Sequence, residues 1–120
     1  MNILVVDDSS SMRRIIISAL SSIGLSGFKE AGNVPDAMRE ILKEEFDLII
    51  VDINMPGLSG LKLVSFIKGH PTYKDTPVLI VSSEASEDDM RKGMSLGANK
   101  YLCKPFAHGD LQIMVREILA

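Results

Sequence analysis

Short apolar runs alternate along the chain with longer segments in which apolar residues recur every three or four positions. The runs lie at 3–6, 48–51, 78–81 and 101–103, and a weaker one lies at 28–31. They are rich in branched or aromatic residues and do not alternate with polar ones. This pattern predicts strands buried on both faces, as in a parallel sheet.

The longer segments carry the period of an α-helix. Their apolar positions fall within 12–23, 37–42, 61–67, 90–96 and 111–119. Gly24 and Gly69 are expected to end the first and third helices, and Asn33 with Pro35 to open the second. The stretch 86–89, a serine followed by acidic residues, predicts a capping box at the start of the fourth helix.

Five successive strand–helix units predict an α/β fold, because right-handed crossovers between parallel strands place helices on both faces of the sheet. We expect a flavodoxin-like (βα)5 three-layer sandwich with a five-stranded parallel sheet in the order 2-1-3-4-5. Residues 1–120 form a single domain in this prediction, with no output domain. The ligand site of such a sheet lies at the carboxyl ends of its strands, where the strand order reverses.

Composition narrows the class of protein. The chain is 46% hydrophobic and 24% charged with a net charge of −3, which is typical of a globular protein. The mild negative charge argues against a nucleic-acid surface, and no apolar run is long enough for a membrane span. The single cysteine, Cys103, cannot form an internal disulfide and is expected to be a buried small apolar residue. We therefore expect a cytoplasmic protein.

Polar or charged residues follow four of the predicted strands. Asp7 and Asp8 follow the first, Asp52 the third, Ser82 the fourth and Lys104 the fifth. In the strand order 2-1-3-4-5 the three carboxylates crowd one crevice, where their repulsion favours a hard divalent cation. We expect Mg²⁺, with Mn²⁺ as an alternative.

The Lys104 side chain can span most of the roughly 10 Å that separates two strand positions in the sheet. Its ammonium would therefore pair with Asp52 or with a group attached to Asp52. Phosphoryl transfer depends mainly on positioning and on neutralising charge, and a carboxylate can be its nucleophile. A carboxylate, a cation, the Ser82 hydroxyl and an ammonium together suit that reaction.

Four motifs at consistent spacing carry a family resemblance. They are Val5-Val6-Asp7-Asp8, Asp52-Ile53-Asn54-Met55-Pro56-Gly57, Val81-Ser82-Ser83-Glu84-Ala85 and Lys104-Pro105-Phe106. On these motifs the chain resembles the receiver domain of bacterial two-component response regulators. Within that family it is most similar to the stand-alone, CheY-like regulators of the chemotaxis type.

The resemblance implies that Asp52 accepts a phosphoryl group from a sensor histidine kinase. It also implies a Mg²⁺ site formed by Asp8, Asp52 and the main-chain carbonyl of Asn54, with Asp7 acting through a water. The alternative is a purely structural role, in which Asp7 and Asp8 are solvated residues that cap the first helix.

Further roles follow from the same resemblance. Ser82 and Lys104 would contact phosphoryl oxygens, and Tyr101 would be the aromatic switch, although it could be only a core aromatic. Asn54 and Glu84 would tune hydrolysis of the aspartyl phosphate. Two positions depart from the family pattern: Ile53 replaces the tryptophan of CheY, and Ser83 stands where alanine or glycine is common. Ser83 is thus a second candidate for the hydroxyl role, and Ser82 is preferred because it directly follows the strand.

The implied output is a change in affinity of one face for a downstream protein, in chemotaxis or at the flagellar motor. That face consists of the last two helices and the strand between them. Ile113 and Met114 broaden the apolar stripe of the last helix, as surplus core contact or as target-binding surface. The expected partners are a sensor histidine kinase, this target and, as a third, a phosphatase, and the chain would be a monomer or a weak dimer.

Other functions remain open at this point. A receiver outside chemotaxis could act as a phosphorelay intermediate, a phosphate sink or a dimerising regulator. A haloacid-dehalogenase-like phosphatase also uses a strand-end aspartate, but it places a second carboxylate where this chain has Asn54. An FMN-binding flavodoxin-like module would need a phosphate loop after the first strand. Ser9-Ser10-Ser11 resembles such a loop only weakly, because it contains no glycine. We expect no enzyme activity beyond the chain's own phosphorylation and dephosphorylation.

Overall fold

The computed structural model describes residues 1–83 and 87–120. Its core is one parallel sheet of five strands in the order β2-β1-β3-β4-β5. The strands are β1 (Ile3–Val6), β2 (Phe28–Ala31), β3 (Leu48–Val51), β4 (Val78–Ser82) and β5 (Lys100–Cys103). The predicted strand order is confirmed. The structure extends the fourth strand by one residue, to Ser82, and starts the fifth one residue earlier.

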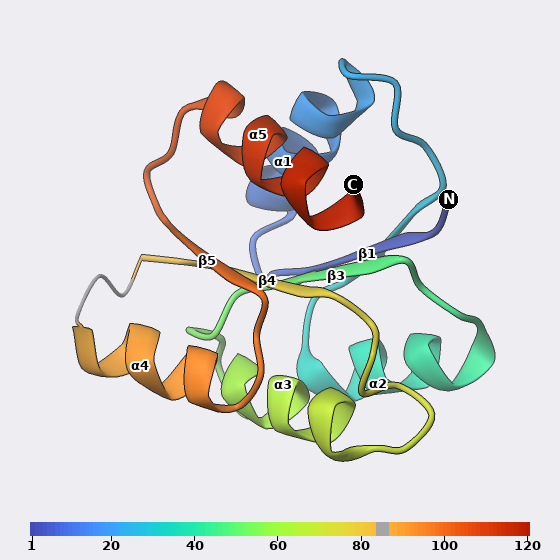
Figure 1. Cartoon of the computed structure of the whole chain (residues 1–120), viewed down its shortest axis with the longest axis vertical. Coiled ribbons are helices and arrows are strands. Elements are labelled where there is room, and N and C mark those ends of the chain that lie inside the picture. The colour runs from blue at the N-terminus through green and yellow to red at the C-terminus, as the bar shows by residue number, and fades with distance from the viewer. Residues whose placement is uncertain (84–86) are drawn as a thin grey trace.

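The helices form two layers, one on each face of the sheet. They are α1 (Ser10–Ser21), α2 (Val34–Lys43), α3 (Gly60–Gly69), α4 (Glu87–Ser95) and α5 (His108–Leu119). Figure 1 shows α1 and α5 on one face and α2, α3 and α4 on the other. The three-layer sandwich is therefore confirmed. Strands β1, β3 and β4 are buried along their whole length, as their uninterrupted apolar runs predict.

Local signals explain where the first helices begin and end. The Asn33 side chain caps α2 by accepting a hydrogen bond from the Asp36 amide at 2.8 Å, as predicted. Ser9, rather than an aspartate, caps α1 through the Met12 amide. Gly24 has a φ of +90° in the turn after α1, which suits a glycine. The predicted capping box begins at residue 86, which lies outside the described residues.

Each face of the sheet has its own apolar cluster. One cluster packs beneath α2, α3 and α4, and the other beneath α1 and α5. The buried stripes of two helices are narrower than their apolar patterns predict. Leu42, included in the stripe of the second helix, is 65% exposed, and Met94 of the fourth is 44% exposed. Cys103 is only half-buried, although it was expected to be buried.

No helix in the described parts of the chain combines the length and the apolar character that a membrane crossing needs.

Candidate functional site

The polar residues predicted to converge do lie together at the carboxyl edge of the sheet. β1 and β3 are neighbours, and the hydrogen bond from the Asp52 amide to the Val6 carbonyl, 2.9 Å long, carries their pairing one residue past the strands. Asp7 is held likewise on the other side of β1, where its amide donates to the Ala31 carbonyl of β2. Strand register therefore fixes both aspartates at the same level of the sheet.

Asp7, Asp8 and Asp52 form a compact carboxylate cluster. One oxygen from each residue lies within 4.8 Å of the others. Asp7 is only 1% exposed and Asp52 is also buried, whereas Asp8 is open to solvent. The reading of Asp7 as a solvated helix cap is therefore wrong. The chain buries this carboxylate beneath the first turn of α1, where one oxygen accepts a hydrogen bond from the Ser9 amide at 2.9 Å.

Lys104 reaches this cluster from the end of β5, two strands away from Asp52. Its Nζ lies 2.7 Å from Oδ2 of Asp7 and 3.1 Å from Oδ2 of Asp52. The stem therefore spans the gap between the strands, as expected, but the shorter contact is with Asp7. Its backbone is held by a hydrogen bond from its amide to the Ser82 carbonyl, and the peptide bond to Pro105 is cis.

Burial and pairing shift the ionisation of both partners. Burial raises the pKa of Asp52 above its ordinary value, although the Asn54 amide and the Lys104 ammonium both favour the charged form. For Lys104, burial alone lowers the pKa, but the hydrogen bond and charge of Asp7, followed by those of Asp52, outweigh it. The net pKa of Lys104 is raised, so the ammonium is charged at neutral pH.

Asn54 contributes two contacts at this edge. Its amide donates to Oδ1 of Asp52 at 2.9 Å, so both oxygens of Asp52 have a donor. Its side-chain amide donates to Oγ of Ser82 at 3.3 Å. Ser82 is fully buried at the end of β4, whereas Ser83 is exposed, so the structure brings Ser82 rather than Ser83 to this edge.

Tyr101 and Glu84 are the two further residues predicted for the site. Tyr101 is buried in the cluster beneath α2, α3 and α4. In the sheet it pairs with Ile80, two positions before the strand-end Ser82. Glu84 lies outside the described residues, so its expected role stays a prediction.

Two supporting residues were missed by the sequence reasoning. Arg13 of α1 donates to the main-chain oxygen of Asp7 at 2.5 Å and pairs with Glu30 of β2 at 2.9 Å. Gly60, at the start of α3, lies so close to the strand end that a β-carbon there would be 2.1 Å from the Asp52 carbonyl oxygen. Arg13 lies in the first turn of α1, six residues after Asp7, and this position was a usable signal for the first contact. Nothing in the local sequence indicates the second.

The residues at this edge fit a hard divalent cation. Carboxylate and carbonyl oxygens are the ligands that Mg²⁺ prefers, and exposure of Asp8 leaves room for the waters that Mg²⁺ retains. Both oxygens of Asp7 already accept hydrogen bonds, from Ser9 and Lys104. Both oxygens of Asp52 are engaged in the same way, by Asn54 and Lys104, so the role of Asp7 through water stays a prediction.

Comparison with known proteins agrees with this geometry. The family model of the response regulator receiver domain matches residues 3–116. The chemotaxis protein CheY of Pseudomonas aeruginosa is 36% identical over 118 residues, which cover 98% of this chain and 95% of that protein.

Solved structures agree as well. The chemotaxis response regulator CheY4 of Vibrio cholerae superposes with a TM-score of 0.90 at 32% identity, covering 98% of each chain. The response regulator TrrA of Thermotoga maritima, solved in complex with Mg²⁺-BeF, gives a TM-score of 0.87 at 28% identity, covering 99% of this chain and 100% of that one. The parallel sheet, its acidic carboxyl edge and these matches together show that the chain belongs to the response regulator receiver domain family, as a CheY-like member.

Proposed function

We propose that this receiver domain is switched by phosphorylation of Asp52, with the phosphoryl group supplied by a sensor histidine kinase. One observation carries the proposal. The Lys104 ammonium crosses from β5 to bridge the buried carboxylates of Asp7 and Asp52, beside the solvent-exposed Asp8. A phosphoryl acceptor needs this combination of a nucleophile, a fixed positive charge and an open side for the donor.

In the proposed reaction an oxygen of Asp52 attacks the phosphorus of a phosphohistidine. The new O–P bond forms as the N–P bond breaks, and the electron pair goes to the leaving imidazole nitrogen. Oδ2 of Asp52 faces Lys104, whose ammonium can turn to a phosphoryl oxygen while it keeps its 2.7 Å contact with Asp7. Bound Mg²⁺ would supply the charge that offsets the phosphoryl oxygens, held by Asp8, Asp52 and the Asn54 carbonyl, with Asp7 acting through water.

The same proposal includes a path by which phosphorylation of Asp52 would change the α4-β5-α5 face. Ser82 Oγ accepts the Asn54 side chain at 3.3 Å, and its hydroxyl would donate to the phosphoryl group once that group is attached. β4 pairs directly with β5, which carries Tyr101. A movement of Ser82 would therefore change the position of β5 and of the α4-β5-α5 face. Exposed apolar side chains on that face, Met94 and Ile113, support a protein target there.

The pathway is proposed from the relatives. The CheY protein of Pseudomonas aeruginosa is a chemotaxis protein, and CheY4 of Vibrio cholerae is a chemotaxis response regulator. We place this chain in the same kind of pathway, with a histidine kinase, a downstream target and a phosphatase as partners. The chain would act only in its own phosphorylation and dephosphorylation, as a signalling regulator and not as an enzyme with an external substrate.

Intact-mass spectrometry tests the phosphorylation directly. The protein is incubated with acetyl phosphate and Mg²⁺, beside Asp52→Asn and beside a sample with chelator in place of Mg²⁺. We expect one phosphoryl addition that hydroxylamine removes, absent from the variant and from the chelated sample. Unchanged addition to Asp52→Asn would refute the assignment of the acceptor.

The target face has its own test. The protein is used as bait with and without beryllofluoride, which mimics the phosphoryl group. We expect a protein that is retained only with beryllofluoride, retained still by Ile15→Ser and lost with Ile113→Ser. Ile15 is the matched control because it is also an exposed isoleucine, on α1. Equal retention by both variants would move the target away from α5.

A further inference from the structure

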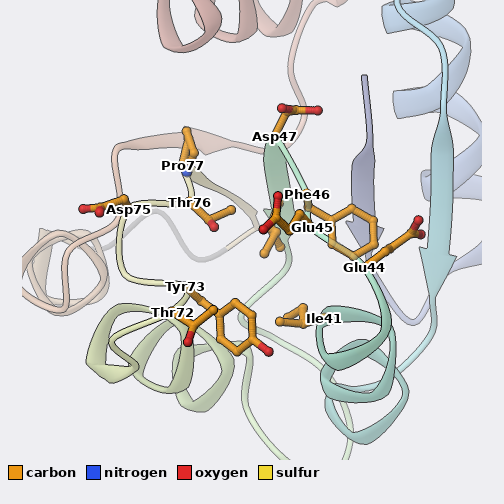
Figure 2. Close-up of a pocket in the computed structure, with 11 residues that line it drawn as sticks. Ile41, Glu44, Glu45, Phe46, Asp47, Thr72, Tyr73, Asp75, Thr76 and Pro77 are labelled. Carbon is orange, nitrogen blue, oxygen red and sulfur yellow. The ribbon is translucent and has the colours of Figure 1, made fainter.

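A hollow of about 350 Å³ lies at the opposite edge of the sheet from the carboxylate cluster. Its lining includes Phe46 and Asp47, just before β3, and Thr76 and Pro77, just before β4, so it sits at the amino ends of these strands. Figure 2 shows it between the connection from α2 to β3 and the connection from α3 to β4. Its size falls within the range of small-molecule and side-chain pockets. The proposed phosphorylation does not use it.

The inner wall of the hollow is apolar and firmly packed. Ile41, Phe46 and Ile49 contribute to the wall and are buried in the core. Tyr73 forms another part and is held by ring contacts, with its centroid 4.6 Å from that of His70 and 6.1 Å from that of Phe66. An aromatic wall of this kind offers a ring face to a cation or an apolar stem.

The rim of the hollow is acidic. Glu44, Glu45, Asp47 and Asp75 line it, and the lining includes no lysine or arginine. In Figure 2 the carboxylates of Asp47 and Asp75 lie at the periphery, and that of Glu45 lies nearer the middle. Asp47 accepts the Asn2 amide at 2.8 Å. Within the described residues, the carboxylates of Glu44 and Glu45 form no hydrogen bond and no ion pair.

A lysine close to this rim is engaged elsewhere. The Lys68 ammonium donates to the main-chain oxygens of Lys74 and Thr76 and to the side chain of Asn99. It therefore holds the turn that carries Asp75 and does not line the hollow. Its charge also acts on Asp75, so the carboxylates that remain for a cation from outside the chain are those of Glu44 and Glu45.

We propose that this hollow binds the guanidinium or ammonium group of a basic side chain presented by a protein partner. An arginine fits best, because its planar guanidinium stacks on aromatic rings and pairs with carboxylates. The apolar wall would cover the stem, and the free carboxylates of Glu44 and Glu45 would meet the charge. We choose a protein partner because Leu42, the residue after Ile41 in α2, is 65% exposed. A protein surface would cover this leucine, whereas a small free cation would leave it in water.

The test is an NMR titration of the ¹⁵N-labelled protein with defined probes. The first probe is acetyl-Leu-Arg-Leu-amide, and its neutral analogue carries citrulline in place of arginine. We expect saturable shifts confined to the amides of 41–49 and 72–77. We expect the citrulline peptide to bind about tenfold more weakly, equivalent to about 1.4 kcal/mol. Shifts that are absent, or equal for the two peptides, would overturn the proposal.

Matched variants separate the hollow from general charge attraction. Glu44→Gln with Glu45→Gln should weaken the arginine peptide about fivefold, as expected for two partly exposed ion pairs. Glu87→Gln with Asp88→Asn removes the same charge from exposed positions on α4 and should leave the affinity unchanged. Equal weakening by both pairs would show unspecific attraction and would sink the proposal.

A last comparison distinguishes a basic side chain of a protein from a small free cation. n-Propylguanidinium carries the arginine head group without a peptide and should bind more weakly than acetyl-Leu-Arg-Leu-amide. Leu42→Ser should reduce the affinity of the peptide and leave that of n-propylguanidinium unchanged. If the small cation binds as tightly as the peptide, the choice of a protein partner is wrong.

Discussion

At the scale of single residues, the site consists of two buried carboxylates that share one ammonium. Asp7 and Asp52 both contact Nζ of Lys104, and Asp8 adds a third carboxylate at the surface. Buried charges persist in a fold only when they are paired and hydrogen-bonded. There are three carboxylates and one ammonium in this cluster, so the edge keeps a net negative charge. That charge would attract a divalent cation, and the bound cation would in turn attract the phosphoryl donor.

Removing the shared ammonium tests this pairing. Lys104→Met should lower the free energy of unfolding at pH 7 by about 3–5 kcal/mol, because it leaves buried carboxylates without a cation. The loss should shrink as the pH falls, since protonated carboxyls need no partner. Lys100→Met is the control: its ion pair with Glu117 is exposed and should be worth less than about 1 kcal/mol. Urea unfolding of both variants measures the difference, and equal losses would contradict the pairing.

The raised pKa of Lys104 determines the pH above which its ion pairs stop stabilising the wild-type fold. A raised pKa in the folded state means that the stabilisation is complete below the ordinary lysine value of about 10.4. Through the titration of Lys104 the stabilisation is lost as the pH rises through the folded value, whereas at acid pH it shrinks because the partner carboxyls become protonated. No acid loss of stability should therefore come from Lys104 itself.

Asp52 has the opposite consequence for stability. Burial raises its pKa, so the folded state favours the protonated carboxyl and loses stability as the pH rises from about 4 through the folded pKa. Asp52→Asn should therefore raise the urea midpoint at pH 7 in the absence of Mg²⁺. The gain should shrink as the pH falls towards about 4 and disappear well below it, where the carboxyl is protonated in both states. A variant that is less stable than the wild type at pH 7 would show that the Lys104 contact outweighs burial.

At the scale of elements, the helices and strands follow local signals, but their spacing is set by packing. Apolar periodicity predicted all five strands and the five helical segments, and Asn33 and Gly69 lie where the second helix starts and the third ends. The same periodicity placed Leu42 and Met94 on buried stripes, although they are 65% and 44% exposed. A repeat gives only the angle of a residue around its helix. Whether the margin of a stripe is covered depends on the neighbouring element.

The start of α3 is the clearest case of packing that supports the site. A β-carbon at Gly60 would lie 2.1 Å from the Asp52 carbonyl oxygen and 2.7 Å from the Ile53 α-carbon. Backbone atoms on both sides leave little room for relief. Gly60→Ala should cost about 1–3 kcal/mol of stability, as for other overpacked sites, and should slow phosphorylation from acetyl phosphate.

Gly69 supplies the matched control at the other end of the same helix. A β-carbon there would meet nothing within 4 Å. Gly69→Ala should change stability by less than about 1 kcal/mol, with an unchanged phosphorylation rate. If the two variants behave alike, the close approach of α3 to Asp52 does not matter.

At the scale of the whole molecule, one sheet separates two apolar clusters. Leu63 belongs to the cluster beneath α2, α3 and α4, and Leu20 to the cluster beneath α1 and α5. Both side chains are fully buried. Every strand that supports one cluster also supports the other, so we expect the two layers to unfold together.

Leucine truncations test this cooperativity. Leu63→Ala and Leu20→Ala should each lower the free energy of unfolding by about 2–5 kcal/mol, with a single transition in urea. Leu42→Ala should stay within about 0.5 kcal/mol of the wild type, because its side chain is mostly exposed. A second transition in either core variant would show that the layers unfold separately.

The order of residues alone predicts the alternation of strands and helices, the sheet edge that carries Asp7, Asp8, Asp52, Ser82 and Lys104, and the family of the chain. These follow from periodicity, capping residues and strand-end motifs, all of which are local properties. The folded chain was needed to show that Lys104 contacts Asp7 more closely than Asp52, that Asn54 reaches Ser82, and that an acidic hollow opens at the opposite edge. Those features depend on strand register and helix packing, which bring together residues that lie far apart in the chain.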